Sequence, residues 1–206
     1  MRHALLFFLS IALLGSAASA GEYNQTLSIG DTAPAWNDLP GVDGKTYSLK
    51  DLEEKKVVVV AFTCNSCPYA VDYEDRMIAL AKKYGGENGQ AALVAINVNK
   101  VESDLPAAMK QRAEEKGFNF PYLFDETQKI AKAYGAQRTP EFYVLDADRK
   151  VVYMGALDDN TDASKVEMLY VEQAIAAALK GGQPEVKETP PIGCAVRYQR
   201  VRRTRD

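Results

Sequence analysis

The chain has 206 residues and a formal net charge of −3 at pH 7, with 25 Lys and Arg against 28 Asp and Glu. This length is enough for one domain with a substantial core. The slightly negative balance gives no bulk electrostatic support for nucleic acid binding, so we expect no nucleic acid partner.

Residues 1–20 have the features of a cleavable signal peptide. They contain a positive residue near the start, a mostly apolar run and a small-residue cleavage site that ends at Ala20. The apolar run is too short for a comfortable transmembrane helix. We therefore expect a mature protein of residues 21–206 that is periplasmic or secreted and has no stable membrane insertion after cleavage.

Cleavage would also remove Arg2 and the only histidine, His3. The remaining chain holds 24 Lys and Arg against 28 Asp and Glu, a net charge of −4. A chain without histidine cannot form a Cys-His hydrolase site, a Ser-His-Asp triad or a His-ligated metal centre. The three cysteines all remain, and we expect neither a metal nor another cofactor.

The stretch 57–68 organises the chain. Four valines and two further apolar residues predict a strand buried on both faces, as in a mostly parallel sheet covered by helices. Cys64 and Cys67 follow directly, and residues 69–84 have a helical period. At such a junction the free backbone N–H groups and the helix dipole favour a thiolate on the first cysteine. The CxxC pair therefore indicates a redox site.

The remaining elements follow in chain order. We expect a short strand at 45–49 and a second buried strand at 93–98, which is parallel to the valine strand. Two helices follow at 105–116 and 126–134, then a hairpin of strands 141–145 and 150–154, and a last helix at 164–179. Asp125 with Gln128 predicts the start of the second helix, and Ser164 with Glu167 that of the last one. Met168 is expected to face the sheet.

We predict one domain at 21–182, followed by a Pro-rich and basic tail at 183–206. The tail has no hydrophobic periodicity and contains Cys194. It is either a mobile, solvated segment or an arm that lies on the surface and brings Cys194 to a useful place. As a third thiol, Cys194 could be free, pair between molecules or reach the CxxC pair.

The order of strand, CxxC helix, strand, helix, Thr-Pro, hairpin and final helix is similar to the thioredoxin fold. Several motifs resemble the peroxiredoxin-like and TlpA-like group of AhpC/TSA-type redoxins, over about 29–194. They are FTCNSCPY, YEDR, KGFNFPYLFDETQ, Thr-Pro and TPPIGC, at 62–69, 73–76, 116–128, 139–140 and 189–194. The resemblance implies an α/β fold with a central mixed sheet flanked by helices and an N-terminal β-hairpin extension.

In this resemblance Cys64 is the nucleophile, and Cys67 is the resolving thiol that attacks the mixed disulfide. Pro140 after Thr139 resembles the cis-proline that lies opposite the CxxC pair, where the backbone pairs with bound substrate. The alternatives are an ordinary turn proline and, for the cysteines, a structural disulfide or half of a zinc site. A zinc site needs about four ligands, and a disulfide across so short a loop constrains little.

Two positions depart from the thioredoxin pattern. Val58 replaces the acidic residue that helps to deprotonate the buried thiol, and Thr63 replaces the usual tryptophan. Proton transfer would then need water or a carboxylate at the rim of the site. The candidates by fold position are Glu141, Asp158 and Asp159, which are otherwise ordinary solvated acids.

Three functions stay open. The first is an extracytoplasmic thiol–disulfide oxidoreductase that exchanges disulfides with exported proteins and uses an unidentified thiol electron donor, in either direction. The second is a peroxiredoxin-like thiol peroxidase, for which Ala61 lacks the expected hydroxyl and Arg138 is the only candidate arginine. The third is a non-enzymatic Cu(I) or thiol-metal chaperone that uses two or three cysteines.

Overall fold

The computed structural model describes residues 21–86 and 88–200. The predicted signal peptide lies outside the described residues. Within the described ranges, no helix is long and apolar enough to cross a membrane.

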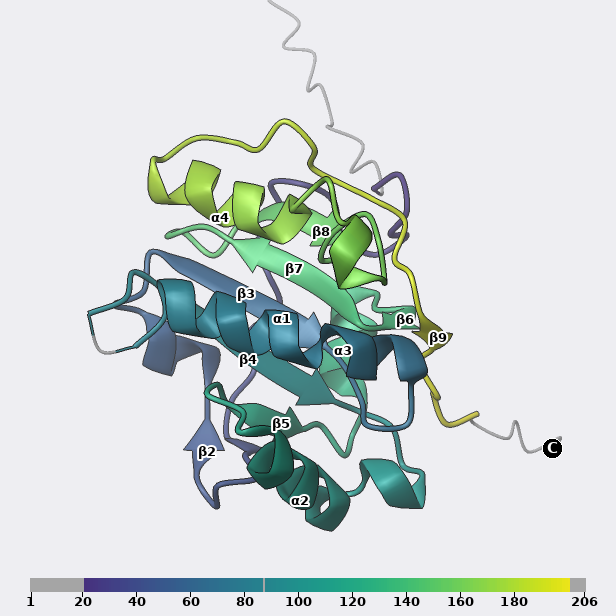
Figure 1. Ribbon diagram of the computed structural model, residues 1–206. Helices are drawn as coiled ribbons and strands as arrows, with labels where there is room; N and C mark the ends of the chain where they lie inside the picture. Colours follow the sequence, from purple (N-terminus) through teal and green to yellow (C-terminus); the bar gives the residue numbers. More distant parts are fainter. Residues whose placement is uncertain (1–20, 87, 201–206) are drawn as a thin grey trace, which may run out of the picture.

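A five-stranded mixed sheet forms the centre of the molecule (Figure 1). The strand order is β5 (Tyr122–Phe124), β4 (Ala91–Asn97), β3 (Val57–Phe62), β7 (Glu141–Leu145) and β8 (Val151–Gly155). β3 is parallel to β4, and β4 to β5, whereas β7 is antiparallel to both β3 and β8. Every residue of β3 is buried, which confirms the prediction of a strand covered on both faces.

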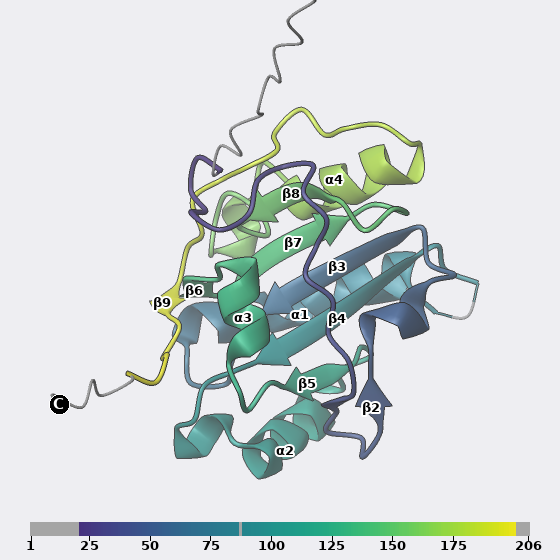
Figure 2. The same cartoon turned by 180° about the vertical axis from the view of Figure 1, so that it is seen from behind.

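Helices cover both faces of this sheet. α1 (Pro68–Tyr84) and α4 (Tyr170–Leu179) lie on one face, and α2 (Pro106–Lys116) lies at the β5 end (Figure 1). α3 (Lys129–Tyr134) and the N-terminal segment lie on the other face (Figure 2). The fold is thus the thioredoxin-like α/β arrangement that the order of elements predicted.

The alternation of side chains along β3 divides the core into two clusters. Val59 belongs to the cluster that contains Ile175 of α4. Val60 belongs to the cluster that contains Trp36 and Tyr134 of α3, whose ring centroids are 6.5 Å apart. Because both faces of this strand are apolar, it holds the residues that follow it in a fixed position.

The N-terminal hairpin consists of β1 (Leu39–Pro40) and β2 (Thr46–Tyr47), which pair antiparallel. The strand predicted at 45–49 is shorter than expected. Ser48 already caps a turn of 3-10 helix, η1 (Leu49–Leu52), and so ends the extended segment.

The last helix begins later than the sequence predicted. Ser164 lies in a separate 3-10 turn, η3 (Ala163–Lys165), so it does not cap α4. The Asp159 carboxylate accepts the backbone N–H of Glu167 at 3.0 Å, which keeps this residue outside the helix. Met168 is 38% exposed and does not face the sheet. The predicted capping box and the first turn of this helix are therefore wrong.

α3 also begins later than predicted, because Gln128 has another role. Its backbone is left-handed, with φ 60°, and its side-chain amide donates to the carbonyls of Val98 at 2.8 Å and Arg197 at 3.0 Å. The carboxylate of Asp125 accepts the N–H of Ile130 at 2.8 Å. Gln128 thus binds the C-terminal segment of the chain instead of capping the helix.

The segment beyond α4 lies against the domain. Residues 187–199, here called the C-terminal strap, pass along β8 and reach β6 (Arg138–Thr139), where they form β9 (Cys194–Ala195) (Figures 1 and 2). The Thr189 hydroxyl oxygen accepts the N–H of Ala156 at 2.9 Å. Of the two interpretations of the tail, the structure shows the surface-bound arm.

Candidate redox site

The CxxC pair lies between β3 and α1. Cys64 follows the strand, and Cys67 is the N-cap residue of the helix. Their side chains are 3% and 1% exposed, so both are buried. Because α1 begins only after Cys67, Cys64 lies in the loop before the helix.

Hydrogen-bond donors surround the sulfur of Cys67. The thiol of Cys64 is the strongest, followed by the thiol of Cys194 and the N–H groups of Ala70 and Cys194, and together they lower the pKa of the Cys67 thiol to about 4. Its sulfur also lies 2.9 Å from the carbonyl oxygen of Thr139, a contact that favours the protonated thiol. Burial also opposes the lowering, but the net shift of the Cys67 pKa is downward, so the thiolate forms more readily on Cys67.

Cys64 has the opposite shift. Its pKa is raised because its thiol donates to Cys67, because it is buried, and because the carboxylate of Asp104 is near. Its sulfur also lies 3.4 Å from the Thr139 hydroxyl and 3.7 Å from the Ser66 hydroxyl. The directions of the two pKa shifts thus favour Cys67 as the ionised thiol, whereas the helix-start argument from the sequence favours Cys64.

A buried carboxylate that the sequence did not single out lies behind this thiol. Asp104 ends the 3-10 helix η2 (Glu102–Asp104) and has no exposed surface. Its two oxygens accept the Ser66 N–H at 2.8 Å and the Ser66 hydroxyl at 2.6 Å, and the Asn99 amide donates to it at 3.2 Å. A path of polar atoms thus leads from the Cys64 sulfur through Ser66 to a base.

One sequence signal could have found Asp104. It follows β4 in the chain, and β4 is parallel to β3. Because the carboxyl ends of parallel neighbours meet at one edge of a sheet, residues after β4 lie beside the CxxC loop. The predicted parallel pair of strands therefore already pointed to this neighbourhood, although not to this residue.

Asn65, the other residue between the cysteines, is held on the same side. Its amide donates to the carbonyl of Ser103 at 2.8 Å, and its oxygen accepts the hydroxyl of Tyr122 at 3.0 Å. Burial raises the pKa of Tyr122 well above its ordinary value, so the phenol stays a donor. We call Ser103, Asp104 and Tyr122 the fixed wall of the site.

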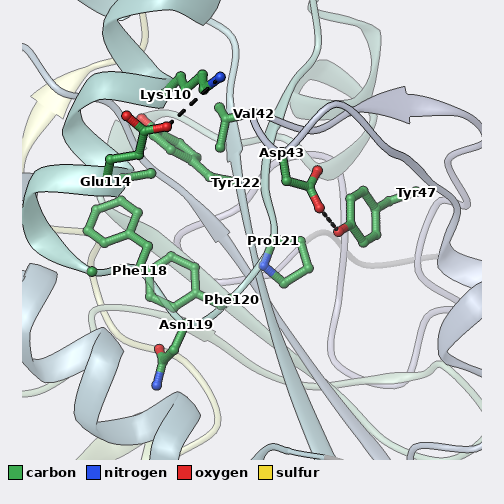
Figure 3. Close-up of a pocket in the computed structure, with 12 residues that line it drawn as sticks. Val42, Asp43, Tyr47, Lys110, Glu114, Phe118, Asn119, Phe120, Pro121 and Tyr122 are labelled. Carbon is green, nitrogen blue, oxygen red and sulfur yellow. Dashed lines mark hydrogen bonds and ion pairs between the residues drawn. The ribbon is translucent and has the colours of Figure 1, made fainter.

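Tyr122 also lines a groove of about 690 Å³ between α2 and the N-terminal hairpin (Figure 3). Phe118 and Phe120 form an apolar part of its lining, and on the hairpin side the Tyr47 hydroxyl donates to Asp43 at 2.6 Å (Figure 3). None of the residues that line it is a cysteine. The groove adjoins the fixed wall, but the thiols do not open into it.

The strap forms another side of the site. Thr139 of β6 pairs with Cys194 of β9, and the two strands are antiparallel. The Thr139–Pro140 peptide bond is cis. Thr139 contacts both cysteines of the CxxC pair, so the structure brings Thr139, Pro140 and all three cysteines together. The backbone predicted to bind substrate is thus paired with the protein's own C-terminal strand.

The three carboxylates predicted as proton carriers bond elsewhere. Burial raises the pKa of Glu141, which accepts the N–H of Arg138 at 2.9 Å and so shapes the loop before the proline. Asp158 is fully buried in an ion pair with Arg76 at 2.6 Å, and Asp159 is an exposed loop residue. In the described part of the chain, none of these three is hydrogen-bonded to a cysteine.

All three cysteines are free thiols. Cys64, Cys67 and Cys194 belong to one small cluster around Ala70. Among the described residues, no group of three or more His, Cys, Asp or Glu side chains is arranged to hold a metal ion.

Comparison with known proteins gives consistent relatives. A sequence profile described as Redoxin matches residues 28–170. The solved structure of a conserved protein from Geobacillus kaustophilus is 37% identical, covers 85% of this chain and 95% of that one, and superposes with a TM-score of 0.77.

Two kinds of curated relative match as well. Thiol-disulfide oxidoreductase ResA of Bacillus anthracis is 29% identical over 130 residues, which cover 62% of this chain and 69% of ResA. A protein of Mycobacterium tuberculosis named as a peroxiredoxin is 28% identical over 142 residues, covering 61% of this chain and 83% of the relative. The Redoxin match contains the CxxC pair and the Thr-Pro pair, whereas Cys194 lies beyond it.

Proposed function

The chain belongs to the Redoxin family, and from this premise we propose that it is an extracytoplasmic thiol–disulfide oxidoreductase that exchanges disulfides with exported proteins. Its oxidoreductase role follows from the family and from relatives such as ResA. The signal-like residues 1–20 support export, and with it a substrate among exported proteins.

The observation that carries the mechanism is the pair of buried, free cysteines between β3 and α1, in which the pKa of Cys67 is lowered and that of Cys64 is raised. In the first step the Cys67 thiolate attacks one sulfur of a substrate disulfide. The new bond joins Cys67 to the substrate, and the other substrate sulfur leaves as a thiolate.

In the second step Cys64 resolves this mixed disulfide. Once Cys67 is neutral, the Cys64 thiol no longer donates to an anion and can turn to Ser66, which hands a proton to Asp104. Cys64 then attacks the Cys67 sulfur, the second substrate thiolate leaves, and a Cys64–Cys67 disulfide remains. A thiol electron donor reduces that disulfide, and the reverse sequence would oxidise a substrate.

Thr139 and Pro140 supply the substrate-binding edge in this proposal. The backbone of Thr139 pairs with Cys194 of the strap, which shows that this edge accepts an antiparallel strand. An extended substrate segment would take the place of β9 and add to the edge by main-chain hydrogen bonds.

The proposal is tested by the reduction of insulin with dithiothreitol as the electron donor. Cys67→Ser should lower the rate by more than about a thousandfold, because it removes the nucleophile of a covalent mechanism. A variant that keeps only Cys67, with Cys64→Ser and Cys194→Ser, should accumulate a mixed disulfide with substrate. Insulin reduction by Cys67→Ser at the wild-type rate would contradict the proposal.

Export is tested separately. The mature protein should begin at Gly21 in periplasmic or secreted material, as N-terminal sequencing would show. Material that begins at Met1 and stays in the cytoplasm would overturn this part of the proposal and leave the chemistry unaffected.

A thiol peroxidase is the second candidate, because one relative is named as a peroxiredoxin and the pKa of Cys67 is low. The position three residues before Cys67, where a peroxidase needs a Thr or Ser, is Cys64. We therefore expect hydrogen peroxide to oxidise Cys67 no faster than an ordinary thiolate. Peroxide turnover that outruns insulin reduction by orders of magnitude would favour the peroxidase.

A further inference from the structure

Two other cysteines lie beside Cys67 in the fold: Cys64 from the same loop and Cys194 from the C-terminal strap. Cys64 belongs to the same small buried cluster as Cys67, Cys194 packs against this cluster, and the backbone N–H of Cys194 donates to the Cys67 sulfur at 3.4 Å. The CxxC mechanism uses Cys64 only. Cys194 is therefore a third thiol in direct contact with the reacting atom.

The structure holds Cys194 in this place through the residue before it. Gly193 has φ +154°, and a Cβ added there would lie 2.0 Å from the carbonyl oxygen of Thr139. Only glycine permits this close approach of two backbones. The approach sets Cys194 opposite Thr139, places its backbone N–H on the Cys67 sulfur and packs the residue against the cluster of the other two cysteines.

The strap has anchors on both sides of this contact. Before it, the Thr189 hydroxyl bonds to Ala156 and Tyr153. After it, Val196 is 8% exposed within the core cluster of α3, and the N–H of Gln199 donates to the Gln128 side chain at 2.8 Å. These contacts on either side define the position of Cys194 in the folded chain.

We propose that Cys194 is a third redox-active cysteine, which forms a disulfide with Cys67 in alternation with the Cys64–Cys67 bond. The proposal rests on the proposed function, because turnover supplies the Cys64–Cys67 disulfide. The Cys67–Cys194 bond ties β9 over the Thr139 edge. The oxidised protein then excludes a substrate strand until a thiol donor reduces the bond.

The exchange step is balanced without an added oxidant. The Cys194 thiolate attacks the Cys67 sulfur of a Cys64–Cys67 disulfide, so that the Cys67–Cys194 bond forms as the Cys64–Cys67 bond breaks. Cys64 leaves as a thiolate and takes up a proton in place of the one that Cys194 lost. No electrons are gained or lost by the protein.

The charges around Cys194 favour its ionisation only after Cys67 has formed a disulfide. Its pKa is raised to about 11, first by the hydrogen bond to Cys67, while the cations of Arg197 and Arg138 oppose this rise. When Cys67 is part of a disulfide, the anion that holds the Cys194 proton is gone. Cys194 then becomes the better nucleophile only in the oxidised protein.

The test uses full-length Cys64→Ser, treated with oxidised glutathione and mapped by mass spectrometry of its peptides. We expect a monomer in which Cys67 is joined to Cys194, with glutathione disulfide taking the two electrons. Adding Gly193→Ala, which keeps every thiol but displaces the strap, should slow formation of this bond by about tenfold or more. Partially oxidised wild type should be a mixture of molecules with the Cys64–Cys67 disulfide and molecules with the Cys67–Cys194 disulfide. This measurement does not depend on the folding of a variant.

Three results would overturn the proposal. They are a Cys194–Cys194 dimer, a glutathione adduct on Cys67 that Cys194 does not resolve, and wild type in which only Cys64–Cys67 is found. Insulin reduction by Cys194→Ser separates the two proposals. If this variant still reduces insulin, the CxxC mechanism stands whatever the fate of Cys194.

Discussion

The two sides of the CxxC loop differ in how they are held. The fixed wall is part of the core, and Asp104 binds Ser66 with hydrogen bonds of 2.6 and 2.8 Å and no exposed surface. The strap comes from beyond the last helix. The backbone N–H of Cys194 lies 3.4 Å from the Cys67 sulfur, and Cys194 is partly exposed. One side is thus part of the core, whereas the other is a segment from beyond the last helix that pairs with an edge strand.

The two sides therefore suit different functions, proton transfer for the fixed wall and substrate binding for the strap side. A buried carboxylate that accepts several hydrogen bonds is costly to disturb, which suits a group that must keep one thiol in place and receive its proton. Main-chain pairing along an exposed edge is easily exchanged for another strand, which suits substrate binding.

The largest contrast is expected between the two thiols themselves. Cys64 lies against the fixed wall with a raised pKa, whereas the pKa of Cys67 is about 4. At about pH 5.5 an ordinary thiol of pKa ~8.5 is only about one part in a thousand thiolate, whereas the lowered pKa of Cys67 keeps most of this thiol ionised. A thiolate of lower pKa is also a weaker nucleophile, so iodoacetamide should label Cys67 at least about tenfold faster than Cys64 at about pH 5.5.

Peptide mass spectrometry of the labelled, reduced protein measures this ratio. Cys67 is 1% exposed and Cys64 is 3% exposed, so faster labelling of Cys67 cannot come from greater exposure. Faster labelling of Cys64 would restore the order of reactivity that the sequence suggested.

Asp104→Asn breaks the fixed wall. The amide that replaces one oxygen would face two donors, Ser66 and Asn99, and hydrogen bonds to a charged group are worth about 1.5–3 kcal/mol. We expect a loss of about 2–3 kcal/mol in the free energy of unfolding and a fall of about a hundredfold in the rate of mixed-disulfide resolution. Denaturant unfolding under reducing conditions and single-turnover kinetics measure the two effects.

Glu102→Gln is the matched control, because it removes a charge from an exposed position of the same 3-10 helix. It should change neither quantity measurably. Equal behaviour of the two variants would remove Asp104 from the mechanism.

Gly193→Ala displaces the strap and leaves the fixed wall intact. The added methyl group would overlap the Thr139 carbonyl, so β9 must move away from Cys67. We expect about tenfold faster alkylation of Cys67, with a smaller loss of unfolding free energy than Asp104→Asn shows. Gly182→Ala is the control, because a Cβ there meets only one atom, at 3.6 Å. Unchanged alkylation in Gly193→Ala would show that the strap does not limit access to Cys67.

The smallest effect is expected from Asp159→Ala. This exposed residue bonds to the Glu167 N–H and to no cysteine among the described residues. The rate of insulin reduction should stay within about twofold of wild type, and the free energy of unfolding should fall by less than about 1 kcal/mol. A tenfold loss of rate would return a rim carboxylate to the mechanism in place of Asp104.

Much of the fold could be predicted from local patterns. The valine run gave a buried strand, the two central strands proved parallel, and Gly117 ended α2 as expected. Helix starts were less predictable. Ser164 and Gln128 have the residue types of caps, but Asp159 and the strap compete for the groups around them. A helix cap is predicted only from residues that are close in sequence. The side chain of a capping residue, however, can form its hydrogen bonds with groups from any part of the folded chain.

The sequence by itself determined that this chain would place a CxxC pair between a buried strand and a helix, because both the apolar run and the spacing are local. Only the tertiary structure decided in which direction the pKa of each thiol shifts, because the shifts depend on groups that are distant in sequence. Asp104 lies 38 positions from Ser66, and Cys194 lies 127 positions from Cys67. A pKa reflects the charges and donors within a few ångströms, whatever their distance along the chain.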